Sequence, residues 1–549
     1  MENSTDRVDE NQDAEKAGGS TRRIERRDFL LITAAAAASS GISGRSAAAA
    51  EPTKTDELAG LTITEAAHKI RSRELSSVEL TQACLERSKV YNKKVNAYIT
   101  LMQEEALKQA ARLDAETKAG KSRGALHGIP VVLKDNIDTA GTRTSGGSAV
   151  FDDRFPEEDA EVVRRMKESG AVILAKANLQ EFAMGSTSVS TYFHPVRNPW
   201  ALDRMSGGSS GGSAAAVSAN MTIAGVGTDT GGSIRIPAAF CGVVGLKPTY
   251  GLVSIRGIIP RTYSLDHCGP MTKTVEDAAI LLNGMISYDK YDVASVEHGR
   301  EDYLAALKQP VNVLRLGIPR APFFDFLDEE VGKATEAAIA VLNKLVKSVT
   351  DMHLPPAGKF SRSYFDGEIE AFHWEWYQRK AGSYSLNQRR TIEAVHRRLN
   401  DVSSETCSSR VVDYINAQWE LQRLRKTIDD AFTECDLVAL PTMRVLPGPI
   451  NDALAREEGA GMAGEPRQTS NCVPFNTFGI PAVSIPCGFS ASGLPIGLMI
   501  AGPRFSEGRV LALANAYEKA TEWHTRRPRL SPDTPVPPVK RREGDSSGG

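Results

Sequence analysis

The sequence predicts an α/β protein, because strand-like and helix-like patterns alternate along one long chain. Three short runs rich in β-branched residues, the first two bounded by glycine, are typical of buried sheet strands. They are residues 129–133, 171–174 and 483–485. Helical signals precede and separate them. Ser76 and Glu79 have the spacing of a capping box at the start of a helix.

A second helical pattern recurs at steps of four and three residues, which places its side chains on one helical face. It comprises Val331, Thr335, Ala338, Leu342, Leu345 and Val349. No linker or repeat interrupts the chain between residue 51 and the Pro-rich stretch that begins at Pro532. We therefore expect one large domain over residues 51–531 and a flexible C-terminal tail over residues 532–549.

Composition excludes several classes of protein. Of the 549 residues, 41% are hydrophobic and 24% charged, as in ordinary globular proteins. Lysine and arginine total 66 against 68 acidic residues, so no basic field would gather nucleic acid. The cysteines are scattered without a C-x-x-C pair, which argues against a zinc site or a disulfide framework. They are Cys84, Cys241, Cys268, Cys407, Cys435, Cys472 and Cys487.

The first fifty residues have the pattern of an export signal. Arg26 and Arg27 precede an apolar run from Phe29 to Ala38, whereas a helix that spans a bilayer needs about 20 apolar residues. A basic pair, a short apolar run and small residues in this order resemble a twin-arginine signal. We expect residues 1–50 to be a cleaved signal peptide, no stable membrane insertion, and a periplasmic or secreted product. Because this route exports folded proteins, the cysteines need not pair.

The most unusual composition lies between residues 205 and 251, where glycine and serine are dense but apolar residues follow at once. That mixture favours packed loops over a flexible linker. Glycines let backbone N–H groups converge on a negatively charged atom, as an oxyanion site requires. A phosphate-binding loop is not expected, because Ser213 stands where its motif requires lysine.

Two serine mechanisms stay open from the residues alone. Residues 207–211 satisfy G-x-S-x-G, the nucleophile elbow of α/β-hydrolases, with Ser209 as nucleophile and a histidine required downstream. The other mechanism uses a neutral lysine as base, which requires burial to lower the lysine pKa from about 10.4. Lys134 is the candidate, because it ends an apolar run and would lie inside the protein.

Four motifs, in this order, resemble the amidase signature family. They are residues 128–137 (GIPVVLKDNI), 207–213 (GGSSGGS), 229–237 (DTGGSIRIP) and 242–249 (GVVGLKPT). Weaker matches at 479–482 and 493–497 extend the resemblance over residues 56–528. The resemblance implies a single α/β/α domain, in which helices flank a mixed twisted sheet.

The family's Ser-Ser-Lys triad maps onto this chain residue by residue. By this resemblance Ser233 is the nucleophile, Ser209 the bridging serine and Lys134 the base. The family's spacing of 24 residues between the serines selects Ser209 over Ser210. Ser209 would follow a cis peptide bond from Gly208.

The same resemblance assigns supporting roles around the triad. Backbone N–H groups of one loop would form the oxyanion hole. They belong to Thr230, Gly231, Gly232 and Ser233. Ser210, Asp229 and Arg235 would anchor the loops, the last two as a charged pair, without reacting. Cys241 would be a small buried hydrophobic residue.

The resemblance implies an amidase that forms an acyl-enzyme and needs no metal or organic cofactor. Its partner would be a small-molecule amide, and related enzymes also take esters or carbamates. Two alternatives are the glutaminase subunit of a tRNA-dependent amidotransferase and an esterase with Ser209 as nucleophile. An export signal counts against the first alternative, as does the unfamiliar sequence around residues 386–390. Several aromatic residues would either line an apolar substrate pocket or pack a helix on the core. They are Phe365, Phe372, Trp374, Trp376 and Tyr377.

Overall fold

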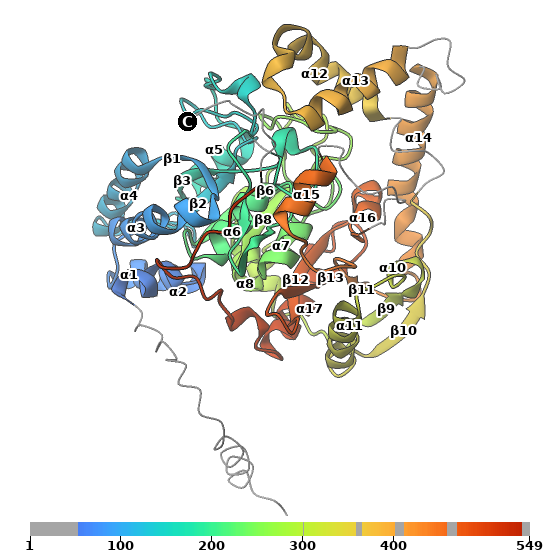
Figure 1. The fold of residues 1–549 in the computed structure, drawn as a ribbon. Helices are drawn as coiled ribbons and strands as arrows, with labels where there is room; N and C mark the ends of the chain where they lie inside the picture. The colour runs from blue at the N-terminus through green and yellow to red at the C-terminus, as the bar shows by residue number, and fades with distance from the viewer. Residues whose placement is uncertain are drawn as a thin grey trace, which may run out of the picture. The chain divides into compact units, whose positions relative to one another are not determined.

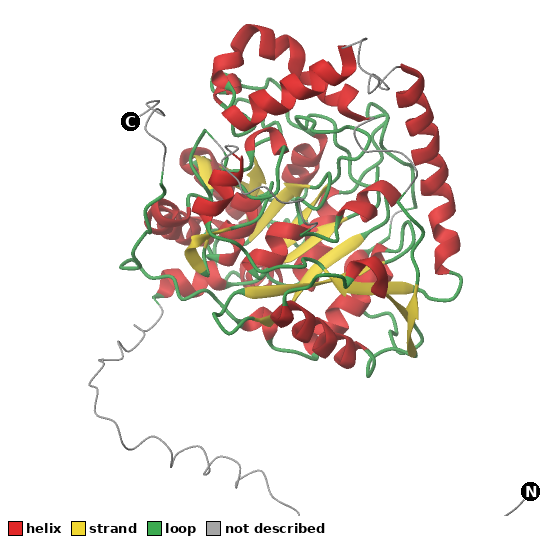
Figure 2. Ribbon diagram, turned by 45° about the vertical axis from the view of Figure 1, so that its right-hand side comes forward, coloured by secondary structure: helices red, strands yellow, loops and turns green. Residues whose placement is uncertain are grey.

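A mixed sheet lies at the centre of the fold, with helices on both of its sides (Figures 1 and 2). The computed structural model describes residues 53–190, 192–299, 301–357, 365–400, 411–457 and 469–540. By its contacts, the chain from Pro52 onward forms one unit. The expected signal peptide, residues 1–50, lies outside the described residues.

Within the described residues, eleven strands form one sheet in the order β1-β3-β2-β6-β8-β7-β12-β13-β11-β9-β10. The strands are β1 (Tyr98–Leu101), β2 (Pro130–Lys134), β3 (Val172–Ala177), β6 (Ala224–Thr228), β7 (Val244–Lys247), β8 (Cys268–Thr272), β9 (Arg315–Pro319), β10 (Ser348–Met352), β11 (Leu437–Pro441), β12 (Ala482–Phe489) and β13 (Pro495–Ala501). Strand β2 pairs in parallel with β3 and β6, and β9 with β10 and β11. The other neighbours are antiparallel. A separate two-stranded ribbon joins β4 (Arg197–Asn198) and β5 (Ala201–Met205). The predicted mixed sheet is confirmed.

The helices surround this sheet. They are α1 (Lys54–Gly60), α2 (Ile63–Ser72), α3 (Ser77–Val95), α4 (Gln103–Lys118), α5 (Glu161–Glu168), α6 (Gly211–Ser218), α7 (Arg235–Cys241), α8 (Val275–Met285), α9 (Tyr303–Ala306), α10 (Arg320–Phe323), α11 (Glu329–Leu342), α12 (Asp366–Lys380), α13 (Leu386–Asn400), α14 (Val411–Thr427), α15 (Ile450–Glu457), α16 (Val473–Phe478) and α17 (Glu507–Lys519). The expected capping box is present at α3, where Ser76 Oγ accepts from Glu79 N and the Glu79 carboxylate from Ser76 N. The expected strands are present as β2, β3 and β12.

The predicted helical face between residues 331 and 349 is correct only in its first half. Val331, Ala338 and Leu342 are buried on α11, which ends at Leu342. Leu345 follows the helix, and Val349 lies in β10, where it pairs with Leu316 of β9. The reason is local, since the β-branched pair Val349–Thr350 suits a parallel strand better than a helix.

The aromatic residues of the block after residue 365 pack against the protein. In Figure 1, α12 and α13 lie side by side above the sheet, and their helix–helix contact is extensive. Trp376 meets the ring of Phe151 edge-on at 4.9 Å, and Trp374 stacks on His396 at 3.3 Å. Phe365 joins a separate buried cluster with Leu265. These contacts fit the interpretation that the aromatic residues pack a helix on the core.

Part of the expected tail is held against the body. Lys94 Nζ donates to Thr534 O at 2.6 Å, and Lys540 N donates to Asn451 Oδ1 at 2.9 Å. In the parts of the chain that the structure describes, no helix combines the length and the apolarity needed to cross a bilayer.

Candidate active site

The candidate site begins where two neighbouring strands end. β2 and β6 are parallel, and Leu133 pairs with Val226. Their last residues, Lys134 and Thr228, therefore lie at the same edge of the sheet. Both side chains are buried, and that of Lys134 has no exposed surface.

Lys134 Nζ is surrounded by oxygen atoms. It donates to Ser209 Oγ at 2.6 Å and to Thr228 Oγ1 at 2.7 Å, with Thr228 O at 3.5 Å. Burial lowers the pKa of Lys134 to about 7, although the negative charges of Asp266 and Asp229 oppose this shift. Close to neutral pH this lysine therefore exists partly as a free amine, as the sequence-based hypothesis requires.

Ser209 lies in the loop that leads into α6. The Gly208–Ser209 peptide bond is cis, as the resemblance predicted. Ser209 O accepts from Gln180 N at 3.1 Å, which fixes the loop from behind. Its neighbour Ser210 acts as the expected anchor, because its Oγ donates to Thr228 O and its N donates to Ser233 O, both at 3.1 Å.

Ser233 stands just before α7 and is the more accessible of the two serines. Its relative exposure is 7%, whereas Ser209 has none. Within the described residues, Ser233 Oγ makes no hydrogen bond, so its hydroxyl is free to face a ligand. The structure thus joins Lys134 to Ser209, and it joins the loops of Ser209 and Ser233 through the backbone.

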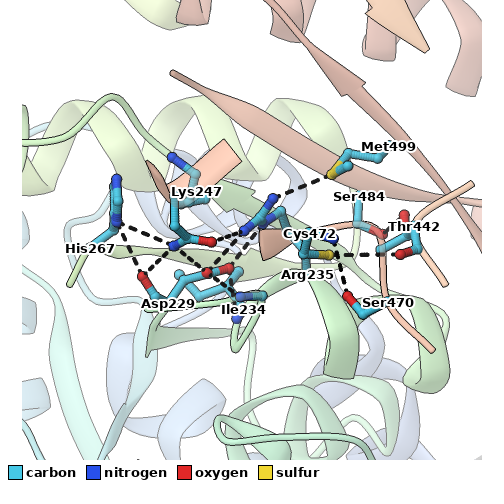
Figure 3. A network of polar contacts seen from close by, with 12 residues as sticks. Asp229, Ile234, Arg235, Lys247, His267, Thr442, Ser470, Cys472, Ser484 and Met499 are labelled. Atoms are coloured by element: carbon cyan, nitrogen blue, oxygen red, sulfur yellow. Dashed lines mark hydrogen bonds and ion pairs between the residues drawn. The ribbon is translucent and has the colours of Figure 1, made fainter. Parts of the chain in front are cut away.

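Asp229 and Arg235 form the expected charged pair behind the loop. Arg235 Nε and Nη2 each donate to the Asp229 carboxylate at 3.0 Å, and neither residue is exposed (Figure 3). Asn476 of α16 completes this network. Its Nδ2 donates to Asp229 Oδ1 at 2.8 Å, and its Oδ1 accepts from Arg235 at 2.7 Å. The guanidinium and these hydrogen bonds hold the pKa of Asp229 well below its usual range.

The same carboxylate changes the predicted oxyanion hole. Gly232 N donates to Asp229 Oδ1 at 2.6 Å, so this N–H group points into the protein and is not available to a substrate. Gly232 therefore does not act as the predicted donor. Gly231 N and Ser233 N have no acceptor among the described residues, so both can serve an oxyanion. Thr230 donates from Oγ1 to Asp266 Oδ1 at 2.5 Å.

Four residues of the site were not predicted. Thr228 and Asn136 lie inside the recognised motifs or next to them, and their places at strand ends beside Lys134 could have indicated them. Asp266 and Asn476 could not be found in this way, because 37 and 247 residues separate them from Asp229. Cys241 is buried as expected, and burial raises its thiol pKa.

The described ranges offer neither a cluster of metal ligands nor a histidine bonded to either serine. These ranges contain no group of three or more His, Cys, Asp or Glu side chains that could hold a metal ion. In the same ranges no histidine hydrogen-bonds to Ser209 or Ser233. His267 is the histidine of the site network, and its Nδ1 donates to Leu265 O at 2.7 Å.

Known proteins resemble this chain along most of its length. A family model described as Amidase matches residues 79–511. A Glutamyl-tRNA(Gln) amidotransferase subunit of Carboxydothermus hydrogenoformans is 37% identical over 490 residues, covering 86% of this chain and all of the relative. The solved peptide amidase from Stenotrophomonas maltophilia superposes with a TM-score of 0.71 at 31% identity, covering 85% of this chain and 98% of that chain. The corresponding amidotransferase subunit from Thermotoga maritima gives 0.66 at 33% identity, covering 88% and 99%.

Proposed function

This chain belongs to the amidase family, and we propose that it hydrolyses a carboxylic amide to an acid and an amine or ammonia through an acyl-enzyme on Ser233. As a member of this family, the chain is an enzyme that acts on carbon–nitrogen bonds other than peptide bonds. The observation that carries the proposal is the contact of 2.6 Å between a buried lysine of lowered pKa and Ser209.

The surroundings of Lys134 suit a base. A neutral amine has two N–H donors and one lone pair. If the donors point to Thr228 Oγ1 and Thr228 O, the lone pair is left for the hydroxyl of Ser209. Ser209 can then pass its proton to Lys134 while it accepts one from Ser233. This second link requires the Ser233 side chain to turn toward Ser209, and catalytic hydrogen bonds often tighten only when a substrate binds.

Two steps then complete the reaction. Ser233 Oγ attacks the amide carbon, and the N–H groups of Gly231 and Ser233 stabilise the oxyanion. The proton held by Lys134 returns through Ser209 to the leaving nitrogen, and the carbon–nitrogen bond breaks. A water molecule repeats the sequence on the acyl-enzyme and releases the acid.

A second candidate function is supported by the relatives' names. The chain covers these relatives over their whole length, and they are subunits of an amidotransferase. In that case the same triad would release ammonia from glutamine inside an assembly that handles charged tRNA. The export-like pattern of residues 1–50 favours a separate amidase instead, since an exported enzyme would not meet charged tRNA.

Substrate profiling separates the two functions. The purified chain is given peptide amides, aryl and alkyl amides, and glutamine, and release of ammonia or amine is measured. Ser233→Ala and the exposed-loop variant Ser492→Ala serve as inactive and active controls. Turnover of simple amides by the chain alone supports the amidase. Turnover of glutamine only, raised by the other amidotransferase subunits, supports the second candidate, and no turnover in either setting contradicts both.

A further inference from the structure

Arg261 lies in a loop that borders the site without belonging to any recognised motif. Two residues before it, Ile259 N donates to Asn136 O at 2.8 Å, and Asn136 contacts Thr228 beside Lys134. Arg261 N donates to Asp266 Oδ2 at 2.9 Å, and the other oxygen of that carboxylate accepts from Thr230. The loop is therefore tied both to the base and to the oxyanion loop.

The guanidinium of Arg261 has no acidic partner. No carboxylate of the described residues lies within 4.0 Å of it, and the hydrogen bond of its side chain is Nη1 to Thr262 Oγ1 at 3.1 Å. A guanidinium has five N–H donors, so most of them remain unused. Arg235 and Arg154, by contrast, are each bound by a carboxylate through two hydrogen bonds.

The side chain of Arg261 is partly enclosed by the protein and partly exposed to solvent. Arg261 is half-buried, and its closely packed surroundings lower its pKa, although Asp266 and Asp366 act in the opposite direction. Asp266 does not neutralise it, because its oxygens already accept from Thr230 and from backbone N–H groups. A partly desolvated cation with free donors favours an anion as its ligand.

We propose that Arg261 determines specificity by binding a carboxylate on the acyl part of the substrate. The preferred substrates would then be amides of dicarboxylic acids or of amino-acid side chains. We place the carboxylate on the acyl part because a primary amide releases only ammonia. Any charged group of such a substrate must therefore lie on its acyl part. This inference rests on the proposed function, since it names the substrate class of the same site.

Matched substrates test the inference by turnover. Succinyl and glutaryl 4-nitroanilides are compared with the 4-methylpentanoyl and 5-methylhexanoyl anilides, in which an isopropyl group replaces the carboxylate. We expect the wild type to favour the charged partner in kcat/KM. Arg261→Gln should lower this preference about 10- to 100-fold, mainly through KM, and Arg261→Lys should restore part of it. The control Arg112→Gln, at an exposed residue of α4, should keep the wild-type preference.

Binding gives a test that needs no turnover. In Ser233→Ala, calorimetry measures the affinity for succinamate and glutaramate against their neutral isopropyl counterparts. Tighter binding of the charged amides that is lost with Arg261→Gln supports the inference even if no anilide is hydrolysed, in which case only the proposed function fails. Equal affinities for charged and neutral amides, or an equal loss of both in Arg261→Gln, would overturn it.

Discussion

Replacing Lys134 with methionine should abolish activity, and it should stabilise the fold at pH 7 but not at pH 10. An ordinary lysine has a pKa of 10.5, and burial lowers that of Lys134 to about 7. The unfolded chain therefore binds more protons than the native protein between pH 7 and pH 10.5, and stability rises with pH across that window. The buried amine costs about 4 kcal/mol at pH 7 and about 1 kcal/mol at pH 10.

Lys134→Met removes this cost but leaves Ser209 Oγ without its partner, which costs about 1–3 kcal/mol at either pH. Urea unfolding measures the stability change from wild type to variant at each pH. Subtracting the change at pH 10 from that at pH 7 cancels the loss of the Ser209 hydrogen bond, because this loss is the same at both pH values. We expect the free energy of unfolding of the variant, relative to that of the wild type, to be higher at pH 7 than at pH 10 by roughly 3 kcal/mol. An advantage that does not change with pH, or a folded variant with near-normal hydrolysis, would refute the reasoning.

Three further predictions concern the loop that contains Asp229 and Gly232, and the expected signal peptide. Asp229→Asn leaves Arg235 as a buried charge without a full partner, so the free energy of unfolding in urea should fall by about 3–5 kcal/mol; an unchanged value would contradict the role of the pair. Gly232→Ala places a Cβ 2.7 Å from Cys472 Cβ at a φ of +125°, so kcat should drop sharply, whereas Gly120→Ala, with positive φ but open space, should keep it; equal kcat values would speak against the packed loop. Changing Arg26 and Arg27 to lysine should leave the precursor in the cytoplasm, as cell fractionation would show; recovery outside the cytoplasm would exclude the twin-arginine route.

The sequence predicts three strands of the sheet, because short apolar runs are local features, whereas the positions of the triad follow from the resemblance of ordered motifs to the amidase signature family. Lys134 ends an apolar run, and such a run becomes a buried strand whose last residue stays inside. The cis bond before Ser209 is implied by the family resemblance, and Asp229 and Arg235 pair within a single motif.

The remaining features depend on contacts between distant segments. Asn476 reaches Asp229 only because α16 packs behind the oxyanion loop, and nothing around residue 476 indicates this. Gly232 was expected to bind the oxyanion because its N–H group lies in the right loop. The direction of that group is set by the Asp229 carboxylate, which a motif does not show. The helix predicted through Val349 ended early because pairing with β9 outweighs helical periodicity.

The central claim is that Ser233 carries the acyl group while Ser209 only relays a proton. The folded enzyme is incubated with a serine-directed fluorophosphonate, and the modified peptide is identified by mass spectrometry. We expect the label on Ser233, slower labelling of Ser209→Ala at the same residue, and none on Ser233→Ala. Label on Ser209 in the wild type would contradict the account and favour the esterase alternative.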